Sequence, residues 1–353
     1  MSSTARPSAI ARSAAQAACS TDPRLARLDA ARWIAALAVV LLHCAAVPVS
    51  GSEPYGSPGW VSANLYDSAV RWCVPVFVMI SGALLLAPAR REGLPRFYMR
   101  RTARILLPLA FWTLFYLGWS ALLERLDGTP TDPWAWLTRL SEGRPYYHLW
   151  YLYMIVGLYL FAPFVRDMYG RLNERRRLAC VLGTLGIAVM DALYRHWAGT
   201  GYGFFLAWFV PYLGYFIAGR MVFEGSLRLP RPGLVLALSV AATAAGVYAL
   251  SNAQAMNFYF YDYFSVTVPF MSLAAFQLIL SQSRLPRLTL LAPLTFGVYL
   301  IHPVFIDLAQ RSDLYEGPMP PAWSLPLVAV AIFVMSAACI WVFQRLPVLR
   351  RVV

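Results

Sequence analysis

The chain has 353 residues, of which 59% are hydrophobic and only 13% are charged, and its formal net charge is +13. So apolar a composition excludes an ordinary soluble enzyme. All 30 basic residues are arginines, which excludes Schiff-base and phosphate-loop chemistry that needs a lysine. The arginines occur in short runs between apolar stretches, as in membrane proteins that follow the positive-inside rule, and not along one nucleic-acid-binding face. We therefore expect a lipid bilayer, and no nucleic acid, as a partner.

Residues 1–28 come before the first apolar segment and lack the compact apolar region and cleavage site of a signal peptide. We interpret them as a flexible, mildly basic cytoplasmic tail. Residues 29–346 are expected to form one membrane domain, and residues 347–353 a short basic C-terminal tail. The five cysteines are scattered without CxxC spacing, so we expect neither a disulfide framework nor a metal site.

Apolar segments long enough to cross a bilayer, which takes about 20 residues, fill most of the chain. They cover residues 30–48, 66–87, 104–123, 148–166, 178–197, 202–220, 232–251, 262–281, 288–308 and 322–345. The sequence thus predicts an all-α polytopic membrane protein with about ten transmembrane helices. A cytoplasmic N-terminus and C-terminus place 24 of the 30 arginines on the cytoplasmic side. Segments 178–197 and 202–220 are the least clearly separated, so nine or eleven spans are also allowed.

The first apolar segment carries Arg32 near its cytoplasmic end and His43 in its outer half. Eleven helical residues make about three turns, so both side chains leave the same face, about 16 Å apart along the axis. An extended pantetheine arm has a comparable length, so the arginine could hold a phosphate while the histidine meets a thioester. The alternative is an arginine that reaches the interface and a histidine satisfied by a neighbouring helix.

The third apolar segment begins with a cluster of arginines. Arg101 and Arg104 lie three residues apart on one helix face, with Arg100 beside them. Guanidinium groups bind phosphate oxygens in pairs, so the cluster is a candidate site for the phosphates of a nucleotide-bearing donor. Arg90, Arg91 and Arg96 lie just upstream. Anionic lipid head groups would bind such a cluster equally well.

The second and ninth segments carry further small and polar residues. In the second segment Pro75, Ser81 and Gly82 would permit close helix packing. The ninth segment carries Thr295, Gly297, Tyr299, His302 and Asp307. His302 is expected at the depth of His43, so the two could share an active site. Because Pro303 follows it, its ring could instead bond to a freed carbonyl. Asp307 is the acid best placed to orient His302, although five residues of helix is poor geometry for a direct contact.

The outer loops contribute two other histidines and several aromatic residues. His148 opens the fourth segment beside Trp150 and is expected at the outer interface, where a polar residue costs little. His196 lies at another segment end and receives no role. Tryptophans and tyrosines near the segment ends are typical interfacial anchors, and they could also stack on sugar rings. They include Tyr55, Trp60, Trp134, Trp136, Tyr146 and Tyr147.

Five motifs in order, between Arg27 and about Leu308, resemble the acyltransferase-3 family of membrane acyltransferases. They are the Arg-x10-His of the first segment, VPVFVMISG, the Arg-x-x-Arg of the third segment, HLWYLYMIVGLYLFAP and FGVYLIHP. Within the family they are most similar to the branch of surface-polysaccharide and enterobacterial common antigen O-acetyltransferases. The last segment matches in hydrophobicity alone.

The resemblance implies an O-acyltransferase of the bacterial inner membrane. It implies acyl-CoA, usually acetyl-CoA, as a co-substrate bound from the cytoplasm, no permanently bound cofactor, and a saccharide or glycolipid hydroxyl as acceptor. It also implies catalytic roles for His43 and Arg32 and donor contacts for Arg101 and Arg104, with Arg100 beside them. Transfer through a fused periplasmic esterase-like domain is not expected, because this sequence carries none. His302, Tyr299, His148, Trp150 and Ser81 are further candidates for holding the acceptor or supporting His43.

A neutral histidine can take the proton of a sugar hydroxyl as it attacks a thioester, or it can carry the acyl group itself. The sequence leaves both routes open. It also leaves a second class of function, a secondary transporter or flippase for a polar or lipid-linked solute, because intramembrane Arg, His and Asp build proton relays. No half-to-half similarity is evident, and the polar residues gather in segments one to three and nine, which favours an enzyme. A structural scaffold would need neither Arg32 nor His43.

Overall fold

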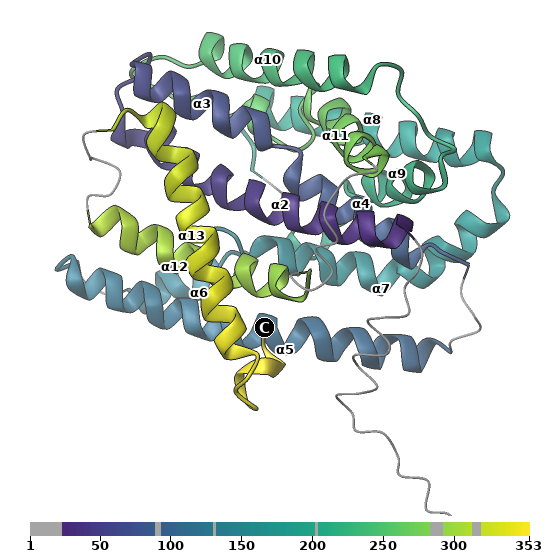
Figure 1. The fold of residues 1–353 in the computed structure, drawn as a ribbon, viewed down its shortest axis with the longest axis horizontal. Coiled ribbons are helices and arrows are strands. Elements are labelled where there is room, and N and C mark those ends of the chain that lie inside the picture. Colours follow the sequence, from purple (N-terminus) through teal and green to yellow (C-terminus); the bar gives the residue numbers. More distant parts are fainter. Residues whose placement is uncertain (1–22, 89–92, 130–131, 202–203, 283–291, 313–318) are drawn as a thin grey trace, which may run out of the picture.

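The computed structural model describes residues 23–88, 93–129, 132–201, 204–282, 292–312 and 319–353. Within these ranges every regular element is a helix, which confirms the predicted all-α class (Figure 1). Eight helical stretches of the described residues are long and apolar enough to cross a membrane. The chain is therefore a multi-pass membrane protein.

The long helices follow the predicted segments in order. They are α2 (Pro23–Val47), α3 (Pro58–Val70) with α4 (Cys73–Leu85), α5 (Leu94–Leu126), α7 (Trp150–Arg171), α8 (Glu174–Ala198), α10 (Pro232–Leu250), α12 (Thr295–Arg311) and α13 (Pro321–Phe343). The short elements are η1 (Pro48–Ser52), α6 (Pro133–Ser141), η2 (Phe205–Ala207), α9 (Leu213–Glu224), η3 (Tyr259–Tyr261), α11 (Val268–Ser281), η5 (Ala292–Leu294) and η6 (Leu349–Arg351).

Two of the predicted spans are shorter than expected. Segment 202–220 contains η2 and the first part of the 12-residue α9, which ends at Glu224, and segment 262–281 contains the 14-residue α11. At 1.5 Å per residue these helices are about 18 and 21 Å long, less than the roughly 30 Å hydrocarbon core. Hydropathy counts apolar residues whether or not their backbone is helical, so it overestimated both lengths.

The second apolar segment is broken near its middle. α3 ends at Val70 and α4 begins at Cys73, so the chain bends at Arg71 and Trp72. The segment thus begins earlier than predicted, at Pro58, and places a charged residue at an internal break. Trp60, predicted to anchor at the interface, is fully buried and donates from Nε1 to the Val49 carbonyl at 3.2 Å.

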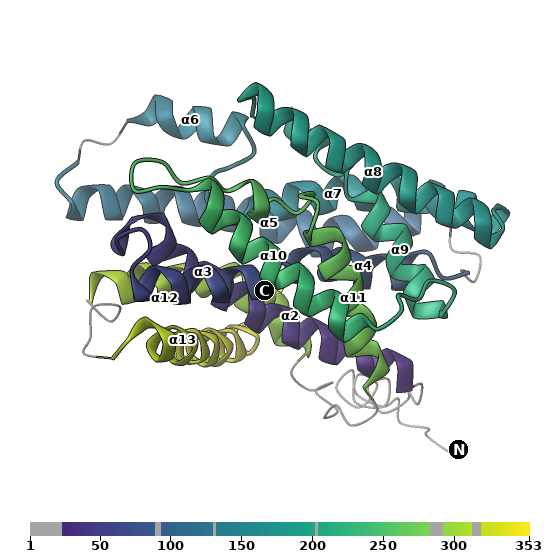
Figure 2. The ribbon, with the colours of Figure 1, turned by 90° about the horizontal axis from the view of Figure 1, so that it is seen from above.

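α2 is the central helix of the molecule. It packs against α3, α4, α11, α12 and α13, and Figure 2 shows it between α13 and α8. Its buried positions are mostly small. They include Ala30, Ala31, Ala35, Ala36, Cys44 and Ala45, each at most 2% exposed. Small residues let helix backbones approach closely in a membrane, so this one sequence feature gives α2 its many neighbours.

α4 and α9 also pack backbone to backbone. A Cβ at Gly82 would clash with the Phe216 backbone, and one at Gly219 would clash with the Met79 backbone. The predicted role of Gly82 in close packing is confirmed. Because α9 packs on α4 through these glycines, it is held inside the bundle although it is short.

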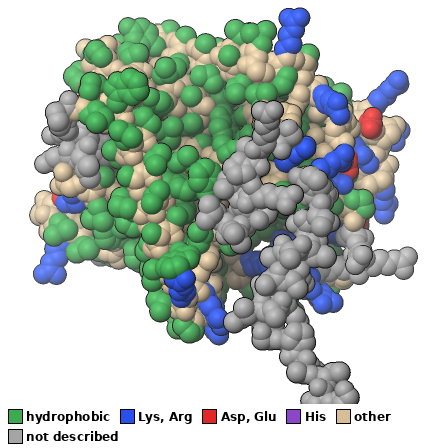
Figure 3. Space-filling view, in the orientation of Figure 1, with side chains coloured by type: hydrophobic (Ala, Val, Ile, Leu, Met, Phe, Trp, Pro, Cys, Tyr) green, Lys and Arg blue, Asp and Glu red, His purple; other side chains and the backbone are tan. Residues whose placement is uncertain are grey.

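Helix ends that were predicted to lie on the same side of the membrane are in contact. Near the start of α2, Arg27 donates to the carbonyl of Leu280, at the end of α11, at 2.9 Å. Arg220 of α9 donates to the Ala83 carbonyl at the end of α4 at 2.9 Å. In Figure 3 hydrophobic side chains cover most of the visible face and most arginines lie toward its margins, as expected for a surface in contact with lipid. Of the predicted cytoplasmic arginines, Arg6, Arg12, Arg90, Arg91, Arg284 and Arg287 lie outside the described residues.

The helical domain extends beyond the predicted boundaries at both ends. α2 begins at Pro23, six residues before the expected start of the membrane domain. At the other end, Val352 is 6% exposed, and its carbonyl accepts a 2.9 Å hydrogen bond from Trp112 Nε1 on α5. Part of the predicted C-terminal tail is therefore packed on the bundle.

Candidate active site

Three histidines from different parts of the sequence meet in the bundle. The ring of His43 on α2 stacks on that of His302 on α12, with centroids 5.3 Å apart. His148, which directly precedes α7, lies 5.6 Å from His302 in an edge-to-face arrangement. The expectation that His43 and His302 lie at one depth is confirmed, and the structure adds His148 to the cluster.

The backbone of α12 fixes the orientation of His302. Pro303 has no N–H, which leaves the carbonyl of Tyr299 without its helical donor. His302 Nδ1 lies 2.8 Å from that carbonyl oxygen and 3.2 Å from the carbonyl of Val298. Nδ1 therefore carries the proton and Nε2 is a lone-pair acceptor. This Nε2 is buried and has no hydrogen-bond partner in the described chain.

Asp307 does not orient His302. Its Oδ2 accepts hydrogen bonds from Trp119 Nε1 at 2.7 Å and from the Tyr146 hydroxyl at 2.6 Å. The five-residue spacing along α12 turns the carboxylate toward α5 and the 146–148 loop instead. This correction leaves backbone carbonyls as the groups that hold the His302 ring.

His148 is buried, in contrast to the predicted interfacial position. Its side chain is 2% exposed, and its backbone carbonyl accepts a 2.5 Å hydrogen bond from the Tyr299 hydroxyl. The rings of Tyr116, Tyr146 and Tyr299 surround it. Burial, with the neighbouring His302, lowers the pKa of His148 well below its usual range, so the ring is neutral near pH 7.

A cavity of about 1540 Å³ extends from His43. Trp150 lies on its wall and packs against the rings of Tyr212 and Tyr263. Tyr147 also lines it and is 44% exposed. His196, given no role from the sequence, lines it as well and packs on Tyr259 at 5.0 Å. The volume exceeds the roughly 300–1,000 Å³ of common small-ligand pockets and is enough for more than one sugar ring.

Two charged residues of this cavity were not among the predicted site residues. Asp67 and Arg71 line it together with His43 and form an ion pair, Arg71 Nη2 to Asp67 Oδ1, at 2.5 Å. The only sequence signal was a pair of opposite charges four residues apart inside an apolar stretch. Because an intramembrane charge is a functional candidate by default, both residues could have been predicted as site residues from the sequence.

Arg32 lies on the same helix as His43 but outside the residues that line the cavity. It pairs with Asp29 at 2.5 Å, and its side chain is 31% exposed. Tyr151 interacts electrostatically with Arg32 and packs on Tyr299 at 5.6 Å. An aromatic side chain thus links the arginine to the histidine cluster.

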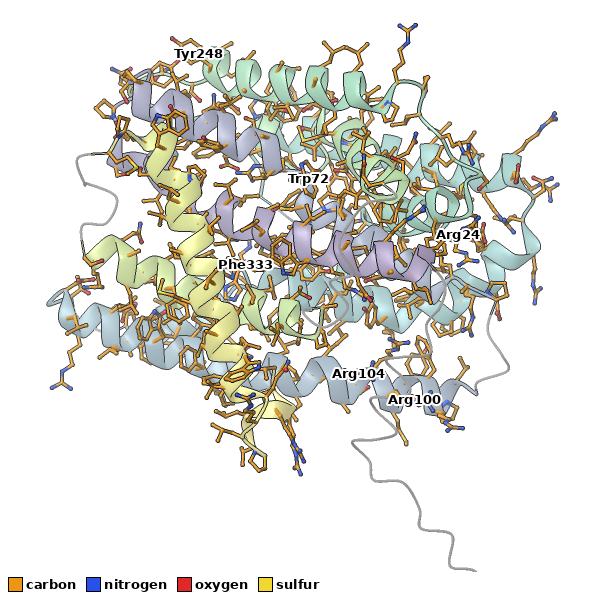
Figure 4. The ribbon with its side chains drawn as sticks, viewed as in Figure 1. Arg24, Trp72, Arg100, Arg104, Tyr248 and Phe333 are labelled. Carbon is orange, nitrogen blue, oxygen red and sulfur yellow. The ribbon has the colours of Figure 1, made fainter. Side chains whose placement is uncertain are left out.

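The arginines of α5 fall into two groups. Arg101 is half-buried, with its guanidinium over the rings of Phe97 at 5.5 Å and Tyr159 at 5.9 Å. The Tyr159 hydroxyl lies 3.4 Å from Ser81 Oγ, which joins Ser81 to this cluster. Arg100 and Arg104 are exposed on the first half of α5 (Figure 4).

Among the described residues, no group of three or more His, Cys, Asp or Glu side chains is arranged to hold a metal ion.

Comparison with known families decides the class of protein. The model of the Acyl_transf_3 family, described as an acyltransferase domain, matches residues 25–345. The chain belongs to this acyltransferase-3 family. No curated protein and no solved structure gave a significant match. The match spans nearly the whole described bundle, so the chain is a membrane acyltransferase, which disfavours the transporter and scaffold hypotheses.

Proposed function

We propose that the protein transfers an acyl group, usually acetyl, from cytoplasmic acyl-CoA to a hydroxyl of a cell-surface saccharide or its lipid-linked precursor in the bacterial inner membrane. The observation that carries the proposal is the position of His43. It stacks on His302 inside the bundle and also lines a cavity large enough for a glycan.

His43 acts as the general base in this proposal. The acceptor hydroxyl gives its proton to the His43 imidazole as its oxygen attacks the thioester carbon. The tetrahedral intermediate then expels coenzyme A as the C–S bond breaks, and the imidazolium returns the proton to the departing sulfur. In the alternative route the acyl group is first bound to the imidazole of His43 and is then passed to the acceptor. This route uses the same residue and the same donor and acceptor positions.

The donor enters from the other end of α2. Arg32 is three turns from His43, about 16 Å at 1.5 Å per residue, which suits a phosphate held at one end of a pantetheine arm. Arg101 supplies a second, half-buried cation, and Arg100 and Arg104 supply exposed charge that attracts an anionic donor. Coenzyme A is a substrate here, and no resident cofactor is required.

The decisive experiment measures transfer of labelled acetyl from acetyl-CoA to membrane glycans by purified His43→Ala protein. We expect kcat to fall by at least about 100-fold, the usual contribution of a general base. The matched control is His196→Ala, which removes another histidine that lines the cavity but packs on Tyr259, away from the cluster. Transfer by folded His43→Ala protein at the wild-type rate would remove His43 from the mechanism.

A further inference from the structure

Asp67 and Arg71 form a buried ion pair at the break between α3 and α4. Their side chains are 1% and 12% exposed, and Nη2 lies 2.5 Å from Oδ1. Taking two charges out of water costs several kcal/mol per ion, and their attraction repays this only when other hydrogen bonds complete both groups. In a membrane protein such a pair usually marks a functional site.

The pair is held rigidly from one side. Arg71 Nη1 donates to the Tyr261 carbonyl at 3.3 Å, and its guanidinium lies 4.0 Å from the centre of the Tyr261 ring. The Tyr261 hydroxyl in turn donates to Asn64 Oδ1 at 2.7 Å. These contacts tie η3 to α3 and prevent the arginine from turning away.

The other side of the pair is incomplete. Asp67 Oδ2 and Arg71 Nε are buried and have no hydrogen-bond partner in the described chain. Both residues line the cavity that reaches His43, and Arg71 is near enough to His43 for their charges to interact. An ion pair that served only to hold the helix break would gain by satisfying these atoms. Left as they are, an acceptor and a donor are available to a ligand beside the base.

A second ion cluster on the cavity wall provides a contrast. Arg195 bonds to Asp191 at 2.8 Å and approaches Asp262 at 3.5 Å, but the Asp191 side chain is 52% exposed. Water competes for such a carboxylate, so it contributes little binding energy. The Asp67–Arg71 pair is desolvated before the ligand arrives, and each new hydrogen bond to it is stronger.

We propose that Asp67 and Arg71 are the acceptor-binding subsite, which holds two oxygens of the sugar ring beside the one that is acylated. Asp67 Oδ2 accepts a hydrogen bond from one sugar hydroxyl, and Arg71 Nε donates to a neighbouring oxygen. The pair is neutral as a whole, which suits an uncharged, polyhydroxylated ring better than a sugar acid or a phosphate. This inference rests on the proposed transfer to a saccharide hydroxyl.

The test separates acceptor binding from donor binding. Asp67→Asn and Arg71→Lys proteins are assayed with [14C]acetyl-CoA and the glycolipid fraction from membranes of a strain that lacks the gene, titrated by hexose content. Hydrogen bonds to charged groups contribute about 1.5–3 kcal/mol. We therefore expect the acceptor KM to rise about 10- to 100-fold in Asp67→Asn while the acetyl-CoA KM changes less than about twofold. The matched control is Asp127→Asn, which removes a carboxylate that pairs with Arg311 outside the cavity, and it keeps both KM values.

An unchanged acceptor KM, or a rise in the acetyl-CoA KM alone, would overturn the inference. If Asp67→Asn is not recovered from the membrane, the double variant Asp67→Asn/Arg71→Gln takes its place, since it leaves no unpaired buried charge. A purely structural pair predicts that the double variant has wild-type KM for the acceptor. If the wild-type protein labels no membrane glycan at all, the proposed function is wrong. If the wild-type protein labels glycan and the variants have the same acceptor KM, only the proposed subsite is wrong.

Discussion

The two ends of α2 hold their polar side chains in different ways. At the His43 end, His302 is fully buried and its ring is fixed by the carbonyl that Pro303 leaves free. At the Arg32 end, the arginine is 31% exposed and pairs with Asp29 one turn earlier. The first arrangement is preorganised for chemistry, and the second is a solvated charge that attracts a ligand. Substitutions at the His43 end should therefore change kcat, and those at the donor end should change KM.

The largest effect that tests this contrast is expected for His302→Ala. The substitution removes the ring that stacks on His43 at 5.3 Å, together with its buried Nε2, which has no hydrogen-bond partner in the described chain. We expect kcat to fall about 100-fold, in the range of a group that assists proton transfer, with the acetyl-CoA KM unchanged.

The control for His302→Ala is Leu300→Ala, which empties a fully buried position on the same helix. It should cost about 2–5 kcal/mol of stability while kcat stays near wild type at temperatures where the protein is folded. Equal losses of kcat in the two variants would mean that α12 packing, and not the His302 ring, sets the rate.

A smaller effect is expected at the donor end from Arg101→Ala. Arg101 is held over Phe97 and Tyr159, so its guanidinium is preorganised for a phosphate, whereas Arg104 is exposed. We expect the acetyl-CoA KM to rise about 10-fold in Arg101→Ala and about two- to threefold in Arg104→Ala, with kcat retained at saturating donor. Saturation kinetics with acetyl-CoA measure both. A fall in kcat that excess donor does not restore would show that the two ends of α2 are not separate.

Much of the architecture could be predicted because it depends on local pattern. The segment around Arg32 and His43 is apolar over its whole length, so its helix and their shared face follow from 3.6 residues per turn. The α3–α4 break was missed because hydropathy averages over it. The one local signal was Pro75, whose missing N–H leaves the Arg71 carbonyl without its helical donor.

The burial of His148 was missed for a different reason. It precedes its helix by two residues, where hydropathy predicts an interface, but in the structure rings that include Tyr116, Tyr146 and Tyr299 enclose it. These tyrosines come from three separate parts of the chain. Contacts between residues so far apart in sequence produce no local sequence pattern from which burial could be predicted.

The smallest effect on kcat among the substitutions near His43 is expected for Pro303→Ala. Alanine restores a backbone N–H that bonds to the Tyr299 carbonyl, so His302 Nδ1 must share the acceptor that now lies 2.8 Å away and keeps to itself only the longer 3.2 Å contact with the Val298 carbonyl. The ring can then adopt the other tautomer, in which Nε2 no longer offers a lone pair. Removing a proline from a helix interior favours the helix, so the melting temperature should rise while kcat falls about two- to fivefold. Melting curves and kcat measured on the same preparation test whether the melting temperature rises while kcat falls. A loss as large as that of His302→Ala, or no loss at all, would mean that Pro303 does not act through the tautomer of His302.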